Sequence, residues 1–325
     1  MYVLSAHITI TGSKRTLEFR SVTSVSITSN IDSLTDVCVI TLPRKLRYKY
    51  QPIYELLAAG DQVKVELGYN GELETLYQGY IRSIRTSKIP AEIYCEDNMY
   101  LLKKVKIDAY QSDALDIKDF IEKFMPVQIE RNVISAKIGK WRFSNCTLAE
   151  ALEQIKKDYP FNFFFKSGKF YGTLPSTLAN QDSNAKRIIF RYKQNIIEDT
   201  ISQEDIDVDK LQIVAYNFLT NGKKIEAKYP EKLADPQIRT FWDDAATDVD
   251  QLKKYAKDKH DSFKVSQVSG SFKAFGWPVV RLMDVVEFRD DENSWRDRKA
   301  FTTKSVRRTF GMNGYRQEIE ILNQV

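Results

Sequence analysis

Residues Phe275–Leu322 read FGWPVVRLMDVVEFRDDENSWRDRKAFTTKSVRRTFGMNGYRQEIEIL, and this stretch decides the fold. Turn-forming residues cluster at 290–293 and at 311–314, and β-branched or aromatic residues fill the segments between them. Such segments, bounded by turns, are typical of strands. The stretch therefore predicts an antiparallel meander with strands at about 284–288, 300–308 and 315–322.

An earlier stretch, residues 57–102, has the same order of elements. A strand starts at Asp61, Asn70-Gly71 forms a hairpin turn, and further strands are expected at 77–86 and 92–96, with a turn at 88–90 between them. When Asp61 is matched with Asp284, the strings Ser83-Ile84-Arg85-Thr86 and Ser305-Val306-Arg307-Arg308 coincide with a one-residue difference in spacing. Repetition of this kind predicts a duplicated β-domain. The alternative is a chance likeness of two unrelated meanders.

Composition places the chain among ordinary globular proteins. Of its 325 residues, 42% are hydrophobic and 29% are charged, which is enough to bury a core in two or three domains. The net charge of +5 is mild, and Lys and Arg alternate with acids along the chain, unlike in a dedicated nucleic-acid binder. The three cysteines are far apart and predict free thiols. We expect neither a signal peptide nor a membrane span.

Three domains are predicted, and the chain as a whole is expected to be mainly β with an α+β part. Residues 1–104 form an antiparallel β-barrel, since Leu4, Ala6, Ile8 and Ile10 alternate with polar residues. Residues 105–185 form a small α+β module with helices at 116–124 and after the capping box of Thr147 and Glu150, ending in a polar linker at 176–186. Residues 186–325 form a second β-barrel, with an Asn221-Gly222 hairpin and an inserted helix at about 244–262.

A search for catalytic or metal-binding residues finds little. His7 and His260 are interpreted as surface histidines, and neither has the partners of a triad or a zinc site. Asp205, Asp207 and Asp209 lack the Gly and Glu that a calcium loop requires. Asp97 beside Glu96 could form a catalytic acid pair, but acids are so common in the chain that no catalytic role is needed to explain them. Gly276-Trp277-Pro278 is interpreted as a tight turn with a packed Trp. We therefore predict no catalytic, cofactor or metal residues.

Basic residues recur on matching strands of the two repeats. Arg82 and Arg85 lie in the first, and Lys304 and Arg307 lie in the second. A lining that faces nucleic acid needs only positive charge at loose spacing. An exposed strand face, or salt bridges to a neighbouring subunit, is the simpler interpretation. These four residues are our candidates for a channel lining or a subunit interface.

Several strings, taken in order, resemble the baseplate hub proteins of contractile phage tails, the late control protein D family. The hub half of type VI secretion spike proteins is similar. The strings extend over nearly the whole chain: Asp36-Val37-Cys38-Val39-Ile40-Thr41-Leu42-Pro43, Gly60-Asp61-Gln62-Val63-Lys64-Val65, Tyr77-Gln78-Gly79-Tyr80-Ile81, Tyr94-Cys95-Glu96-Asp97, Gly276-Trp277-Pro278 and Asp284-Val285-Val286.

This resemblance implies two related barrels of the tail-tube type flanking an α+β module. It implies a homotrimer whose six barrels form a ring that adapts a six-fold tail tube above to a three-fold spike below. DNA would pass through the channel without sequence-specific binding. No spike or lysozyme domain follows the last strand, so the resemblance implies a separate spike protein. The expected location is the virion tail baseplate, assembled in the bacterial cytoplasm.

Two other classes of function remain open at this point. One is a cell-wall hydrolase acting during entry, which would require acids such as Asp97 or Glu96 to be catalytic. The other is a carbohydrate- or nucleic-acid-binding β-protein. Within the structural class, a hub of a related contractile injection or type VI secretion machine is the alternative to a phage tail.

Overall fold

The structure is a computed structural model that describes residues 2–43, 47–48, 51–86, 90–159, 161–174, 185–204, 208–219, 222–243, 246–262 and 267–324. Several predicted features lie wholly or partly outside these residues: the turn at 88–90, most of the linker at 176–186, Asp205, Asp207, Asn221 and the start of the predicted helix at 244–245.

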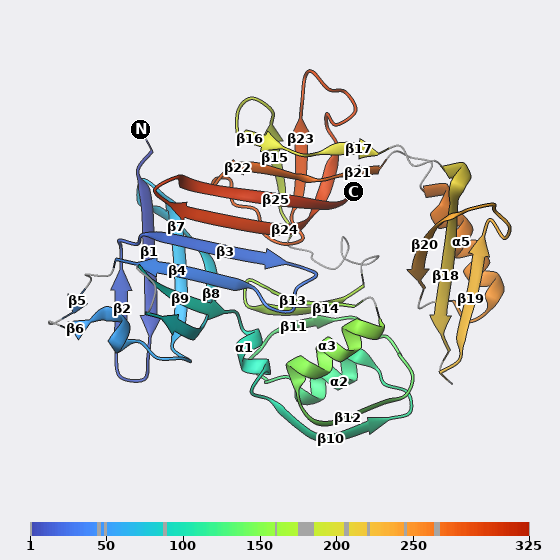
Figure 1. Ribbon diagram of the computed structural model, residues 1–325, viewed down its shortest axis with the longest axis horizontal. Helices are drawn as coiled ribbons and strands as arrows, with labels where there is room; N and C mark the ends of the chain where they lie inside the picture. Colours follow the sequence, from blue (N-terminus) through green and yellow to red (C-terminus); the bar gives the residue numbers. More distant parts are fainter. Residues whose placement is uncertain are drawn as a thin grey trace.

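One 13-stranded sheet organises the molecule (Figure 1), and its strands come from both ends of the chain. The first β-unit supplies β1 (Leu4–Thr11), β2 (Thr16–Phe19), β3 (Ser24–Asn30), β4 (Val37–Leu42), β7 (Gln62–Tyr69), β8 (Glu72–Arg85) and β9 (Ala91–Glu96). The second β-unit supplies β15 (Arg187–Arg191), β16 (Ile196–Asp199), β22 (Ser271–Phe275), β23 (Val285–Arg289), β24 (Ala300–Gly311) and β25 (Gly314–Gln324). Each unit encloses a core of its own.

The two β-units have the same order of hydrogen-bonded strands. The first runs β3-β4-β9-β8-β7-β1, and the second runs β16-β22-β25-β24-β23-β15. These strands occur in the same sequence order in both units, so the predicted meanders β7-β8-β9 and β23-β24-β25 occupy matching places. One pairing differs, because β1 is antiparallel to β7 whereas β15 is parallel to β23. The predicted fold class, mainly antiparallel β with two related units, is confirmed.

The units are joined through β24. Its first residues pair with β23, and its later residues, Ser305–Gly311, pair with β3 of the first unit. Phe310 and Tyr315 of the second unit are buried in the core of the first unit, beside Val25 and Ile40. Because backbone hydrogen bonds and apolar side chains both cross this boundary, the two units form one continuous structure.

The middle module packs below this sheet around helices α2 (Ile117–Phe124) and α3 (Leu148–Asp158) (Figure 1). Asp116 caps α2, and Thr147 and Glu150 form the predicted capping box of α3. Around them lie β10 (Lys106–Ser112) paired with β12 (Trp141–Thr147), and a sheet of β11 (Arg131–Val133), β14 (Lys169–Thr173) and β13 (Asn162–Lys166). The short helix α1 (Met99–Leu102) leads from β9 into the module.

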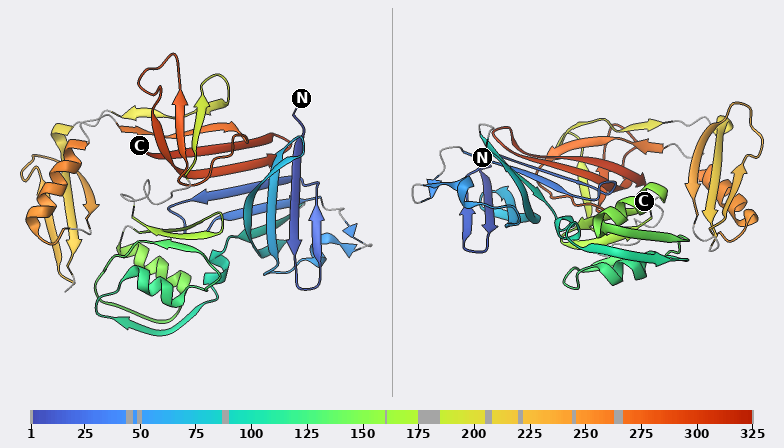
Figure 2. Two further views of the ribbon diagram at one scale, coloured as in Figure 1. Left: turned by 180° about the vertical axis from the view of Figure 1, so that it is seen from behind. Right: turned by 60° about the horizontal axis from the view of Figure 1, so that its bottom comes forward.

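The insertion in the second unit is larger than the single helix that we predicted. Strands β18 (Leu211–Phe218), β19 (Lys224–Tyr229) and β20 (Gln237–Trp242) form a sheet of their own, against which α5 (Val249–Ser262) packs. The two views in Figure 2 show this αβ insertion at one end of the molecule, apart from the large sheet. The predicted hairpin of β18 and β19 therefore does not belong to the second β-unit. An alternating pattern identifies a strand but does not say which sheet it joins.

Short elements complete the described chain: β5 (Arg47–Tyr48), β6 (Gln51–Pro52), η1 (Ile53–Leu56), β17 (Ser202–Glu204), η2 (Val208–Lys210) and β21 (Gln267–Ser269). Strands β17 and β21 pair with each other and lead to and from the insertion. Among the residues that the structure describes, no helix has the length and apolar character to cross a membrane.

Candidate functional site

The four basic candidates lie on two matching strands of the large sheet. Arg82 and Lys304 sit at the same kind of irregularity, because the register of β8 with β9 shifts between Ile81 and Ser83 and that of β24 with β25 shifts between Thr303 and Ser305. Arg85 and Arg307 follow three residues later, and both are exposed. The structure therefore brings the four residues into equivalent positions of the two units.

Acidic side chains compensate the positive charges of Arg82 and Lys304. The Nη1 atom of Arg82 lies 2.8 Å from Oε1 of Glu96, whose Oε2 lies 2.7 Å from Nζ of Lys103. The Nζ atom of Lys304 lies 2.9 Å from Glu320 and 3.2 Å from Asp32, which belongs to the first unit. Lys304 is thus an ion-pair partner at the boundary between the units inside one chain.

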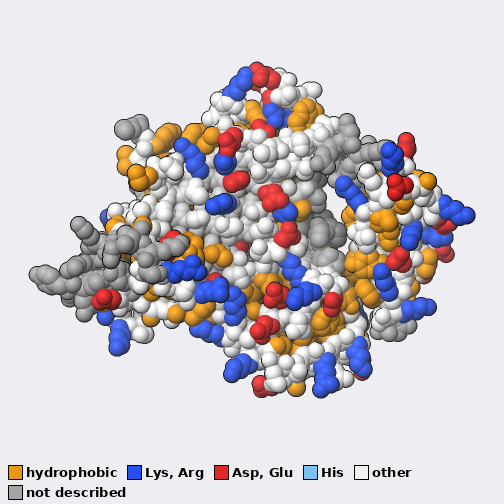
Figure 3. Space-filling model, in the orientation of Figure 1, with side chains coloured by type: hydrophobic (Ala, Val, Ile, Leu, Met, Phe, Trp, Pro, Cys, Tyr) orange, Lys and Arg blue, Asp and Glu red, His pale blue; other side chains and the backbone are white. Residues whose placement is uncertain are grey.

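The two arginines have different surroundings. The guanidinium of Arg85 lies 4.4 Å from the ring centroid of Tyr94, a cation–π contact, and Tyr94 donates a hydrogen bond to Glu92. Arg307 lies opposite Thr28 on β3 and Glu318 on β25. On the face shown in Figure 3, Lys and Arg side chains are interspersed with Asp and Glu over most of the surface. A surface on which positive and negative side chains are mixed does not bind a polyanion such as DNA tightly.

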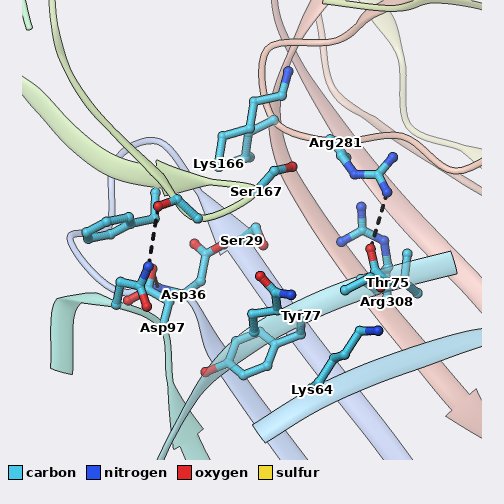
Figure 4. A pocket seen from close by; sticks show the side chains of 16 residues that line it. Ser29, Asp36, Lys64, Thr75, Tyr77, Asp97, Lys166, Ser167, Arg281 and Arg308 are labelled. Atoms are coloured by element: carbon cyan, nitrogen blue, oxygen red, sulfur yellow. Dashed lines mark hydrogen bonds between the residues drawn. The ribbon is translucent and has the colours of Figure 1, made fainter. Parts of the chain in front are cut away.

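A polar cavity of about 390 Å³ lies where the first unit, the second unit and the middle module meet (Figure 4). The first unit contributes Ser29, Asp36, Thr75 and Tyr77, the second contributes Arg281 and Arg308, and the module contributes Lys166 and Ser167 from the turn between β13 and β14. This cavity could not be predicted from the sequence, because its residues come from distant parts of the chain and match no motif.

Two carboxyl groups, those of Asp36 and Asp97, are buried on one side of the cavity. Asp97 accepts hydrogen bonds from the backbone N–H groups of Met99 (2.9 Å) and Asp36 (3.1 Å). Burial raises the pKa of Asp36 to about 7, against the opposing effect of a hydrogen bond to Ser29 and the charge of Arg308. Burial and the neighbouring Asp36 also raise the pKa of Asp97 well above its ordinary value. Burial thus favours the protonated form of both carboxyl groups.

Basic groups face the cavity from the opposite side and tie the three parts together. Arg281 donates to Glu74 (3.0 Å) and to the carbonyl of Thr75 (3.2 Å), both in β8. Lys166 of the module lies 3.0 Å from Asp284 of the second unit; the side chain of Asp284 is buried and that of Lys166 is 9% exposed.

Arg308 is buried as well. It donates a hydrogen bond to the carbonyl of Val280, while its Nε has no partner in the described structure. These contacts fix the orientation of the units, which is a structural role.

Glu96 and Asp97, for which we predicted no catalytic role, do not form an acid pair with each other. Glu96 is neutralised by Arg82 and Lys103, and Asp97 is paired with Asp36 instead. No local pattern in the sequence predicts this pairing, since Asp36 and Asp97 are far apart in the chain. The backbone contacts of Asp97 are those of a residue that stabilises a turn.

Two other predictions about single residues are wrong. His260 is buried, with 7% of its surface exposed, and its ring packs against Tyr229 rather than lying in solvent. Trp277 is 45% exposed and is therefore not a packed side chain. His7 lies partly exposed between Glu18 and Glu66. The three cysteines are free, as predicted. No group of three or more His, Cys, Asp or Glu side chains that could hold a metal ion occurs in the described part of the chain.

Comparison with known proteins gives structural likeness without sequence relationship. No protein-family model and no curated protein sequence matches the chain. Solved structures do match over its whole length. The 43 kDa tail protein of prophage MuSo2 from Shewanella oneidensis superposes with a TM-score of 0.63 and 13% sequence identity, covering 99% of this chain and 98% of that one.

Two further structures extend this likeness. A tail protein from Neisseria meningitidis gives a TM-score of 0.61 at 14% identity, covering 100% of this chain and 97% of that one. The E. coli c3393 protein is a component of the type VI secretion system described as similar in structure to the T4 bacteriophage tail proteins gp27 and gp5. It gives 0.54 at 11% identity, covering 97% of this chain and 76% of that one. The chain thus has the β-rich fold found in prophage tail proteins.

Proposed function

We propose that this protein is a structural hub of a phage or prophage tail baseplate. Three copies would form a ring of six β-units that adapts a six-fold tail tube to a three-fold spike. The observation that carries this proposal is the repeated strand order of the two β-units within one continuous sheet. A chain with two look-alike units presents two similar surfaces, which allows three copies to match six subunits of a neighbouring ring.

The structural comparisons support the proposal at the level of fold. The same fold occurs in a protein of the type VI secretion system, so a hub of a related contractile injection machine is the closest alternative. The sequence resemblance to late control protein D favours the phage tail.

The surface supports a passage for DNA without sequence reading. Near the junction of the units, most outward side chains of β3 and β24 are small and polar, with the exposed Arg307 as a charged exception: Ser24, Ser26, Thr28, Asn30, Ser305 and Thr309. Such side chains offer few apolar contacts or bidentate hydrogen bonds to bases. The nearby charges of Arg82 and Lys304 are compensated by acids. A polyanion would therefore be neither trapped nor strongly repelled.

The location of the protein tests this proposal. Purified tail particles would be labelled with a gold-conjugated antibody against this chain and imaged by negative-stain electron microscopy. We expect label at the end of the tube distal to the head. Label distributed along the tube, or particles without this chain, would contradict a hub.

The buried pair of Asp36 and Asp97 keeps a cell-wall hydrolase as the second candidate, because paired carboxyls with raised pKa values occur in glycosidases. The backbone hydrogen bonds that Asp97 accepts favour the structural role. Zymography on cell-wall material separates the two. We expect no clearing, and clearing that disappears in the Asp97→Asn variant would replace the hub by a hydrolase.

A further inference from the structure

The two β-units agree in detail at the point where the middle strand of each meander, β8 or β24, stops pairing with the strand before it. In the first unit, the N–H of Ile81 donates to the carbonyl of Asp61 (2.9 Å), and β8 has no pairing with β7 beyond this point. In the second unit, the N–H of Thr303 donates to the carbonyl of Asp284 (2.8 Å), and the pairing of β24 with β23 ends there. Ile81 thus matches Thr303, and Ser83 matches Ser305.

Beyond this point, β24 acquires a new partner on the same edge. Ser305–Gly311 pair with β3 of the first unit, with Arg307 opposite Thr28. The N–H of Ile31 also donates to the carbonyl of Lys304 (3.2 Å). The edge of the second unit is therefore covered by the first unit of the same chain, and Val306 is fully buried.

The matching stretch of β8 has no such cover. Ser83–Arg85 pair with β9 on one side, and no strand in the described ranges pairs with their other side. Ile84, which matches the buried Val306, remains half-buried. An open strand edge with an apolar residue is a template for pairing with another strand.

The strand that matches β3 is open as well. Ile93 of β9 matches Ile319 of β25, because they pair with the matching residues Ile84 and Val306. Ile93 also pairs with Ile40 of β4, and Ile319 pairs with Phe272 of β22, so β4 matches β22. The next strand in the first unit, β3, then matches β16 and its continuation β17. On this basis Thr28 matches Ser202. The edge of β3 that meets β24 corresponds to an edge of β16 and β17 that carries no strand partner among the residues described. In Figure 1, β17 lies along one border of the stacked strands, with β25, β24, β3 and β4 between it and β8.

We propose that the open edge of β8 in one copy pairs with the open edge of β17 in a second copy, antiparallel and in the register of the junction between β24 and β3. Arg85 of one copy then lies opposite Ser202 of the next, as Arg307 lies opposite Thr28 within the chain. This inference rests on the proposed hub function and adds the surface by which copies associate. Because the two edges differ, the contact is head-to-tail, and repeating it closes a ring of three when the rotation between neighbouring copies is one third of a turn.

Engineered disulfides test this register, because a disulfide forms only when the Cα atoms are about 4.4–6.8 Å apart. The test variant carries Arg85→Cys and Ser202→Cys in a Cys146→Ser background, which removes the one cysteine that is not buried. The matched control carries Arg307→Cys and Thr28→Cys, whose register inside the chain is known. A register control combines Arg85→Cys with Gln203→Cys, which places the second thiol on the opposite face of its strand.

After mild oxidation, we expect the test variant to give covalent dimers and a closed trimer on a non-reducing gel. The matched control should give only monomers with altered mobility, and the register control should give no links. Light scattering on unoxidised protein at high concentration runs in parallel. Trimers that do not link would overturn this pairing and leave the hub proposal intact. Links that extend into open polymers would overturn ring closure. A protein that remains monomeric and unlinked at every concentration would overturn both proposals.

Discussion

Replacement of Tyr315 by Ala should loosen both β-units at once. Tyr315 belongs to β25 of the second unit, yet its ring is fully buried in the core of the first, 5.9 Å from Phe310 and 5.6 Å from Tyr69 between ring centroids. Truncating a buried aromatic side chain to Ala costs about 3–5 kcal/mol. We expect the free energy of unfolding to fall by this amount, since the neighbouring backbone is fixed by strand pairing and does not collapse into the space.

Tyr315→Phe is the matched control. The hydroxyl of Tyr315 is buried and has no hydrogen-bond partner in the described structure. A buried, unsatisfied hydroxyl stabilises nothing, so its removal should change the free energy of unfolding by less than about 1 kcal/mol, in the stabilising direction. The difference between the two variants isolates the packing of the ring.

Urea unfolding followed by circular dichroism measures both free energies, and hydrogen exchange with mass spectrometry locates the effect. In Tyr315→Ala, the amides of β3 and of β24 should lose protection together, because they share hydrogen bonds across the junction. A loss confined to the second unit, or a Phe variant as unstable as the Ala variant, would refute the reasoning.

Three further perturbations follow from single contacts. A Cβ at Gly276 would lie 2.1 Å from the ring of Tyr315, so Gly276→Ala should lower the thermal midpoint. The same substitution should lower it less in a Tyr315→Ala background, and additive effects of the two substitutions would contradict the contact. Asp36 has a folded-state pKa of about 7, above its unfolded value, so its stabilising contribution is present below about pH 4 and is lost as pH rises through 7. Asp36→Asn should therefore raise the thermal midpoint relative to the native protein at pH 8 and much less at pH 4. An equal effect at both pH values would show that Asp36 does not titrate as described. Lys166→Met should leave the buried Asp284 without its ion-pair partner and lower the free energy of unfolding by on the order of 3 kcal/mol in chemical denaturation. Adding Asp284→Asn should recover much of this loss, and a double variant no more stable than the single one would contradict the contact.

The repeat could be predicted from sequence because it rests on local signals. Period-two alternation and the Asn70-Gly71 turn locate strands, and two similar strings place Arg85 and Arg307 at matching positions. The matching bulges at Arg82 and Lys304 agree with that alignment. These features depend on residues within one meander, which is the range over which sequence patterns report structure.

Features that depend on distant residues could not be predicted. The pairing of Asp36 with Asp97 and the burial of Arg308 arise only when three parts of the chain meet around one cavity. His260 was placed at the surface because α5 is rich in lysine, but the helix packs that residue against Tyr229 of β19. The separate sheet of β18, β19 and β20 was missed because alternation reports a strand and not its partner.

The repetition of one β-unit in a single chain makes rotational symmetry the most direct quantity to measure. Assembled particles of the purified protein would be imaged end-on by electron microscopy, and the rotational power spectrum of the averaged views would be computed. We expect a ring with three-fold symmetry and a strong six-fold component, at a mass three times that of the 37.7 kDa chain. A particle with two-fold symmetry, or a three-fold ring whose six-fold component is absent, would contradict the quasi-equivalence of the two units.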